Sequence, residues 1–145
     1  MILSKSCQYG VRALLYIGMK SEKSGKTELN EIADGLDIPK PYLAKIMQQL
    51  VKRGLARSTK GPNGGFYMTP KEKSKTLLNI VEAVDGLEYF ASCGLGMEYC
   101  DPKRPCPLHG DMVKIRENLM KTFGKYSIEK IGQKIKKGEF SISRN

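Results

Sequence analysis

The residues best suited to chemistry lie in one short segment of this 145-residue chain. Cys93, Cys100, Cys106 and His109 have the spacing C-x6-C-x5-C-x2-H, and they include three of the four cysteines and the only histidine. Thiolates and imidazoles are ligands for zinc and for iron–sulfur clusters. The gaps are wider than the C-x2-C knuckles of most structural zinc sites. The pattern favours an iron–sulfur cluster over zinc, and free thiols that react with oxidants are a third interpretation.

The overall composition narrows the class of protein. Lys and Arg number 25 against 15 Asp and Glu, which gives a net charge of +10 and a pI of ≈ 9.5. This excess favours a polyanionic partner such as DNA, RNA or an anionic membrane surface, although a plain solvated surface rich in lysine is the alternative. No apolar run approaches the roughly 20 residues that cross a bilayer, and the N-terminus lacks a signal-peptide pattern. We therefore expect a cytoplasmic protein whose reduced cysteines serve metal binding or redox chemistry.

Three helices are predicted before the middle of the chain. Apolar residues at spacings of three and four mark a first helix, which Ser4 or Ser6 can cap. A second helix is predicted with Thr27 as its cap. A third opens at Pro41, which suits a first helical position, and ends at Gly54.

A hairpin and further helices follow. Two short strand-like runs flank the glycine-rich tip at 61–65, which predicts a β-hairpin. A fourth amphipathic helix is predicted from about Thr76 to Val84, and a longer helical stretch begins after Gly110. The order of three helices and a glycine-tipped hairpin predicts a mainly α fold, a winged helix-turn-helix with a small β-hairpin wing.

The third helix and the hairpin carry the residues that we expect to contact DNA. In a winged helix-turn-helix the third helix enters the major groove and the hairpin reaches the neighbouring backbone. Glycines allow the hairpin backbone to approach phosphates closely. The alternatives are helices that only pack together, or a winged helix that binds RNA or protein. The expected DNA-contacting residues are Lys40, Pro41, Tyr42, Lys45, Arg57, Lys60, Gly61, Asn63 and Gly64.

Over nearly its whole length the chain resembles the Rrf-two (Rrf2) family of bacterial winged-helix regulators, the group that includes IscR, NsrR and CymR. The resemblance rests on five segments: LSKSCQYGVRALLYI, PKPYLAKIMQQLVKRGL, KGPNGGF, LLNIVEAVDG and the cysteine loop ending in CPLH. It implies a homodimeric transcription factor that binds a double-stranded DNA operator. The long C-terminal helix, which begins near 107–111, would pack against its copy in the partner. We accordingly divide the chain into a DNA-binding domain (1–86), a cluster-binding loop (87–110) and a dimerisation helix with a tail (111–145).

The resemblance also implies a set of cluster ligands. In cluster-bearing members three cysteines of this loop bind a two-iron or four-iron cluster, and a fourth ligand comes from elsewhere. In IscR-like members the fourth ligand is the histidine after the last cysteine, which matches His109. In NsrR-like members it is a carboxylate in the first helix of the other subunit; the matching position here is Gln8, next to Cys7. We rank His109 first and Cys7 second, and the three loop ligands are Cys93, Cys100 and Cys106.

These observations predict a DNA-binding regulator that senses redox state, nitric oxide or iron–sulfur status through its cluster. The alternative is a zinc-stapled or thiol-only winged-helix protein that binds nucleic acid without a cluster. An enzyme is disfavoured, because His109 has no serine or carboxylate partner motif and no phosphate-binding loop is present.

Overall fold

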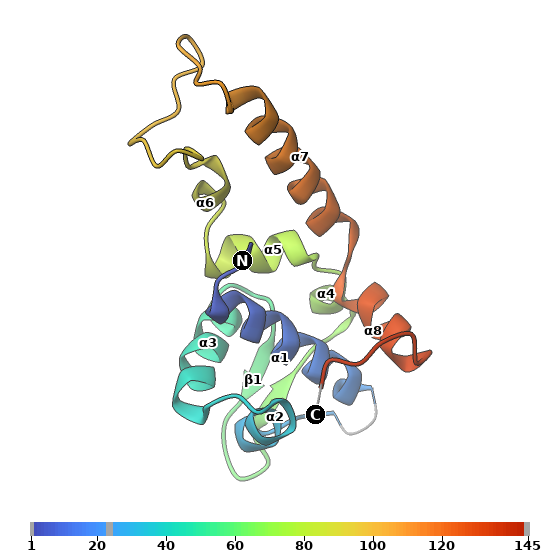
Figure 1. Cartoon of the computed structure of the whole chain (residues 1–145). Helices are drawn as coiled ribbons and strands as arrows, with labels where there is room; N and C mark the ends of the chain where they lie inside the picture. Colours follow the sequence, from blue (N-terminus) through green and yellow to red (C-terminus); the bar gives the residue numbers. More distant parts are fainter. Residues whose placement is uncertain (1, 23–24, 144–145) are drawn as a thin grey trace.

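The computed structural model describes residues 2–22 and 25–143, which form a mainly helical chain with one two-stranded sheet (Figure 1). The helices are α1 (Lys5–Ser21), α2 (Leu29–Leu36), α3 (Lys40–Lys52), α4 (Pro70–Lys73), α5 (Leu77–Val84), α6 (Glu88–Ala91), α7 (His109–Lys125) and α8 (Ile128–Lys136). The strands are β1 (Arg57–Thr59) and β2 (Gly65–Tyr67). This order matches the predicted succession of three helices, hairpin and further helices. The short helices α4 and α6 were not predicted.

Of the predicted helix caps, Ser4 is confirmed and Thr27 is wrong. Ser4 accepts the backbone N–H of Cys7 at 3.1 Å and begins α1. Thr76 likewise precedes α5 as its N-cap. Thr27 does not cap α2, which has Glu28 at its N-cap position. Instead the backbone of Thr27 exchanges hydrogen bonds of 2.9 and 2.8 Å with Phe66 in β2, so this residue is buried beside the hairpin.

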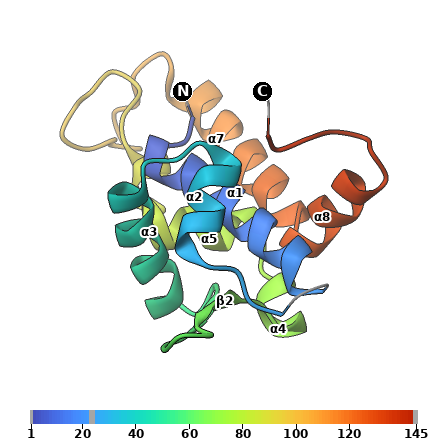
Figure 2. The same ribbon diagram turned by 90° about the horizontal axis from the view of Figure 1, so that it is seen from below.

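The core surrounds α1, which contacts α2, α3, α5 and α8 (Figure 2). The largest fully buried side chains of the described residues come from α1, α2, α3, α5 and the segment before α2; they include Leu14, Ile17, Ile32, Leu43, Met47, Leu50, Ile80 and Val81. Burial of such apolar side chains is the main favourable contribution to folding, at about 25 cal/mol per Å². Helix α3 is therefore held at a fixed angle by its apolar face.

The hairpin is an antiparallel pair in which Arg57 lies opposite Tyr67 and Thr59 opposite Gly65. At its tip Gly61 has a φ of +103°, a conformation that favours glycine. A side chain at Gly64 would collide with the carbonyl oxygen of Thr59. The turn therefore requires glycine at both positions, as the sequence pattern predicted.

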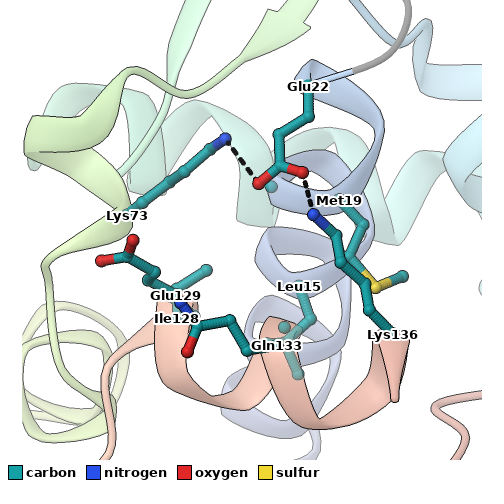
Figure 3. A pocket seen from close by; sticks show the side chains of 10 residues that line it. Leu15, Met19, Glu22, Lys73, Ile128, Glu129, Gln133 and Lys136 are labelled. Atoms are coloured by element: carbon teal, nitrogen blue, oxygen red, sulfur yellow. Dashed lines mark hydrogen bonds and ion pairs between the residues drawn. The ribbon is translucent and has the colours of Figure 1, made fainter. Parts of the chain in front are cut away.

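Helix α7 begins at the loop far from the core and runs back towards α8, which packs against the core (Figure 1). No residue of α7 is buried. Helix α8 packs along α1, where a small cavity of about 120 Å³ remains between them. Figure 3 shows how Glu22 of the α1 C-cap joins two other elements there: Lys73 of α4 is 3.5 Å away, and Lys136 of α8 forms a second ion pair. These contacts fix α8 to the winged unit, the part of the chain formed by α1–α5 and the β-hairpin.

Among the described residues, no helix combines the length and the apolar character that crossing a bilayer would need.

Candidate DNA-binding and cluster-binding sites

The start of α3 offers an exposed basic surface. Lys40 is the first helical residue and follows Pro39 at the N-cap, and α3 contains no acidic residue. Leu43 and Met47 face the core, which leaves the other side of the same turns in solvent. Helix N-termini and lysines both favour phosphate groups. The structure therefore brings four predicted DNA-contacting residues to one exposed helix end: Lys40, Pro41, Tyr42 and Lys45.

The tip of the wing carries a second group of predicted contacts. Lys60, Gly61 and Asn63 are exposed, and Gly64 is half-buried because its N–H donates to the carbonyl of Gly61 at 2.9 Å. The turn exposes backbone as well as the Lys60 ammonium group, as a phosphate contact requires.

Arg57 lies at the base of the wing rather than at its tip. Its Nε donates to Oε1 of Glu72 at 2.8 Å. The side chain of Glu72 is buried and also accepts the backbone N–H of Thr69 at 2.8 Å. Burial alone would raise the pKa of Glu72, but the hydrogen bonds from Thr69 and Arg57 outweigh it and lower the pKa to about 2. Arg57 thus fastens β1 to α4 and keeps part of its guanidinium in solvent.

The cysteine loop brings its three thiols to one open cavity. Cys93, Cys100 and Cys106 all line a depression of about 470 Å³, together with Arg104 and other loop residues. His109 begins α7, and its Nδ1 lies 2.8 Å from Sγ of Cys100. The backbone N–H of His109 also donates to the carbonyl of Cys106 at 3.0 Å. Residues far apart along the loop therefore meet at the N-terminus of α7.

The thiols differ in their electrostatic surroundings. Backbone N–H groups of Leu95 and Met97 donate to the sulfur of Cys93 and lower its pKa. A tight turn at Gly96, which has a φ of +74°, belongs to the same segment. Burial raises the pKa of Cys100, and the neighbouring Cys93 raises it further. The surroundings of Cys93 therefore favour the thiolate, the form that binds metal, whereas those of Cys100 disfavour it.

The donor set of the loop consists of three thiols and one imidazole, which are soft ligands. Among residues 2–22 and 25–143, no group of three or more His, Cys, Asp or Glu side chains is arranged to hold one metal ion. The three thiols nevertheless share a cavity, and one of them contacts an imidazole. Three thiols with one imidazole are a set that suits iron–sulfur chemistry.

Within one chain Cys7 lies apart from this cavity, and its rank as second choice for the fourth ligand, which would come from a partner subunit, stays a prediction. Its side chain lies on the buried face of α1 and is 0 % exposed. It does not line the loop cavity. Burial, followed by the charge of Asp85, raises the pKa of Cys7 to about 12. The neutral thiol is the stable form there, and free cysteine commonly serves as a small core residue.

Two residues beside the recognition helix were missed by the sequence reasoning. Ser6 and Tyr9 of α1 both contact Tyr42. Their spacing of three residues places them on one side of α1, but nothing in the sequence pairs that side with α3.

The comparisons with known proteins agree with this description. A family model named Rrf2 and described as "Iron-dependent Transcriptional regulator" matches residues 3–134. Among curated relatives, a protein of Aquifex aeolicus (strain VF5) named as an HTH-type transcriptional regulator is 31% identical over 146 residues, which covers 99% of this chain and 100% of that protein. Protein aau3 of Rhizobium meliloti (strain 1021) is 28% identical over 130 residues, which is 89% of this chain and 83% of that protein.

Solved structures show the same fold. CymR (YrzC), the global cysteine regulator of B. subtilis, superposes with a TM-score of 0.73 at 21% identity, covering 90% of this chain and 95% of that chain. T. potens IscR gives a TM-score of 0.71 at 17% identity, covering 96% of this chain and 91% of that chain. The predicted winged-helix fold is therefore confirmed. Because the family model covers most of the chain, this protein belongs to the Rrf2 family of transcriptional regulators.

Proposed function

We propose that this regulator adjusts its hold on an operator through an iron–sulfur cluster bound by Cys93, Cys100 and Cys106, with His109 as the fourth ligand. The observation that carries the proposal is the shared cavity of three thiols, one of them 2.8 Å from the imidazole. The family's description as iron-dependent supports iron over zinc. An iron–sulfur cluster would supply an inorganic centre whose charge and ligation change with its redox state.

As a member of its family the chain is a DNA-binding regulator and not an enzyme. Lys40, Pro41, Tyr42 and Lys45 are the proposed contacts of α3 with base edges and phosphates. The proposed wing contacts are Lys60 and the turn of Gly61, Asn63 and Gly64, with Arg57 supporting the wing from its base. DNA is in the cytoplasm of a bacterium, which is where we place the protein.

The loop connects the DNA-binding unit to α7, so we expect the conformational order of the loop to control DNA affinity. Residues 85–108 join the end of α5 to the start of α7, and His109 sits at that junction. When the loop thiols are held together, the start of α7 is held with them. When they are released, α7 gains freedom relative to the winged unit. A coupling of about 1–3 kcal/mol between loop and DNA is typical of such linked sites.

We propose that α7 pairs with a second copy of the chain. Leu108 and Ile115 are 45% and 51% exposed and lie two helical turns apart on one side. On another side of α7, an apolar groove of about 340 Å³ is lined by residues of α6 and α7, including Phe90 and Met120. A homodimer would cover these residues and place two α3 helices about 34 Å apart, one turn of DNA, or a small multiple of it.

Purification without oxygen tests the cluster. The protein should be coloured and should contain iron and acid-labile sulfide, and it should lose both in air. A colourless protein with one zinc per chain, even after anaerobic reconstitution, would replace this proposal with a zinc-stapled module.

A thiol-only sensor is the second candidate, and the lowered pKa of Cys93 favours it. Such a protein would bind DNA without metal and lose affinity when an oxidant is added. Metal analysis together with an oxidant titration of the metal-free protein separates the two functions.

A further inference from the structure

The first turns of α1 lie directly against the exposed start of α3. The hydroxyl groups of Ser6 and Tyr42 are 2.7 Å apart. The rings of Tyr9 and Tyr42 meet edge to face, with centroids 5.6 Å apart and planes at 86°. Tyr42 nonetheless remains 41% exposed. One side chain on α3 is therefore held from two directions while part of it still faces solvent.

The holding residues are themselves anchored. Ser4, which begins α1, donates its backbone N–H to Oδ2 of Asp85 at 3.0 Å, and its hydroxyl also donates to that carboxylate. Cys7, directly after Ser6, is fully buried. The first turn of α1 is thus fixed to the end of α5 on one side and to the core on another, so Ser6 and Tyr9 have little freedom to follow a moving Tyr42.

We propose that Ser6 and Tyr9 are positioning residues that hold Tyr42 in the orientation in which it reads the operator. This inference rests on the proposed contact of Tyr42 with DNA. A surface tyrosine without partners samples several rotamers, and binding would have to order it at a cost in affinity. Here folding has already ordered the ring, so specific binding does not incur that cost.

The hydrogen-bonding capacity of the Tyr42 hydroxyl group also bears on specificity. A phenol hydroxyl donates one hydrogen bond and also accepts hydrogen bonds. The contact with Ser6 uses one of these capacities and leaves the other for a base edge. A hydroxyl group held in one place meets a base edge more selectively than one whose ring samples several rotamers. Ser6 thereby influences specificity although it need not touch a base.

The surrounding charge agrees with a surface that faces a polyanion. The ammonium group of Lys5 lies 5.6 Å from the centre of the Tyr9 ring. Lys40 and Lys45 are exposed on α3. The tyrosine pair is therefore framed by cations from two helices, as expected for a patch that approaches DNA phosphates.

A double-mutant cycle in the full-length protein tests the inference. The probes are a duplex selected by the wild-type protein from a random library and a random-sequence duplex of equal length. Ser6→Ala and Tyr42→Phe should each weaken binding to the selected duplex by about 3- to 10-fold, the range for one lost hydrogen bond. The double variant should be no weaker than either single variant. Binding to the random duplex should stay within about twofold for all three, since phosphate contacts supply it.

Matched controls separate positioning from folding. Ser6→Thr keeps a hydroxyl and should restore the selectivity that Ser6→Ala loses. Tyr9→Phe keeps the ring and should bind like the wild type, whereas Tyr9→Ala should lose selectivity. Thermal unfolding of Ser6→Ala should match the wild type, because the residue is not part of the core.

Three results would overturn the inference. They are unchanged selectivity of Ser6→Ala, equal losses on both duplexes, or strictly additive effects of Ser6→Ala and Tyr42→Phe. If the wild-type protein selects no duplex, the proposed contact of Tyr42 with DNA is itself wrong. If the wild type binds DNA but holds no iron, only the proposed cluster is wrong.

Discussion

The winged unit and the segment that carries the cysteines are built in opposite ways. In the winged unit, α1, α2, α3 and α5 share a core of fully buried side chains. Between 91 and 127, by contrast, no residue is buried. The winged unit is held by apolar packing, while the loop is held by hydrogen bonds around its thiols and by the contact of α7 with α5. Local stability follows the density of buried contacts, so the two regions should open at different free energies.

This difference separates two requirements of a regulator. A surface that reads DNA must keep its shape, whereas a sensing segment must change when its ligand changes. Cys7 and Cys106 show the contrast with a single residue type: one lies in the core and the other lines the loop cavity. Variants of these two cysteines therefore give the most direct tests.

The largest effect is expected for Cys106→Ser. Protein purified without oxygen should lose at least about tenfold in iron per chain, because a hydroxyl is a poorer ligand than a thiolate for iron–sulfur centres. Thermal unfolding of the iron-free protein should not change, since Cys106 is outside the core. Iron and sulfide assays and calorimetry measure the two quantities. Wild-type iron content in this variant would remove Cys106 from the ligand set.

Cys7→Ser is the matched control, with the opposite result. The free energy of unfolding should fall by about 2 kcal/mol, because a hydroxyl replaces a thiol at a site without solvent. Iron per chain should equal that of the wild type. Chemical denaturation of the iron-free protein measures the first quantity. A variant of unchanged stability that loses its iron would return Cys7 to the ligand set and reverse the contrast.

Glu72→Gln tests the rigidity of the winged unit at the base of the wing. The free energy of unfolding should fall by about 1–2 kcal/mol at neutral pH, because the charged hydrogen bonds with Arg57 and Thr69 are lost. The pKa of Glu72 is lowered from 4.5 to about 2, so its contribution is complete above about pH 4.5 and disappears as the pH falls towards 2. Unfolding curves of both proteins should converge over that range. A constant difference down to pH 2 would contradict the ion pair.

The smallest effect is expected for Lys60→Ala at the wing tip. Affinity should fall equally for specific and random duplexes, and the slope of log K against log salt should decrease by about one unit. Stability should not change, because Lys60 is exposed. Lys137→Ala, at the C-cap of α8, is the control and should change neither the affinity nor the salt slope. An unchanged salt slope in Lys60→Ala would take the wing tip out of the DNA interface.

Much of the fold was predictable from local patterns. Apolar spacing marked α3 and α5, including the start of α5 near Thr76, and Ser4 was identified as a cap because capping depends on residues within one turn. Thr27 was misjudged for the opposite reason. Its pairing with Phe66 joins residues far apart in sequence, and no local pattern reports such a pairing.

The candidate sites divide in the same way. The donor set of the loop was evident from residue type and spacing, and the positive charge of α3 and the wing tip from composition. The sequence did not reveal three tertiary contacts. These are the core position of Cys7, the ion pair of Arg57 with Glu72, and the contacts of Ser6 and Tyr9 with Tyr42.

By itself the sequence determined which groups are available: a set of thiols with one imidazole, a basic helix and a glycine turn. These are covalent and local properties, and they persist in any conformation of the chain. Only the tertiary structure decided which of these groups face solvent and which side chains they meet. Burial and contact depend on how segments distant along the chain pack together, and that packing is a property of the whole fold.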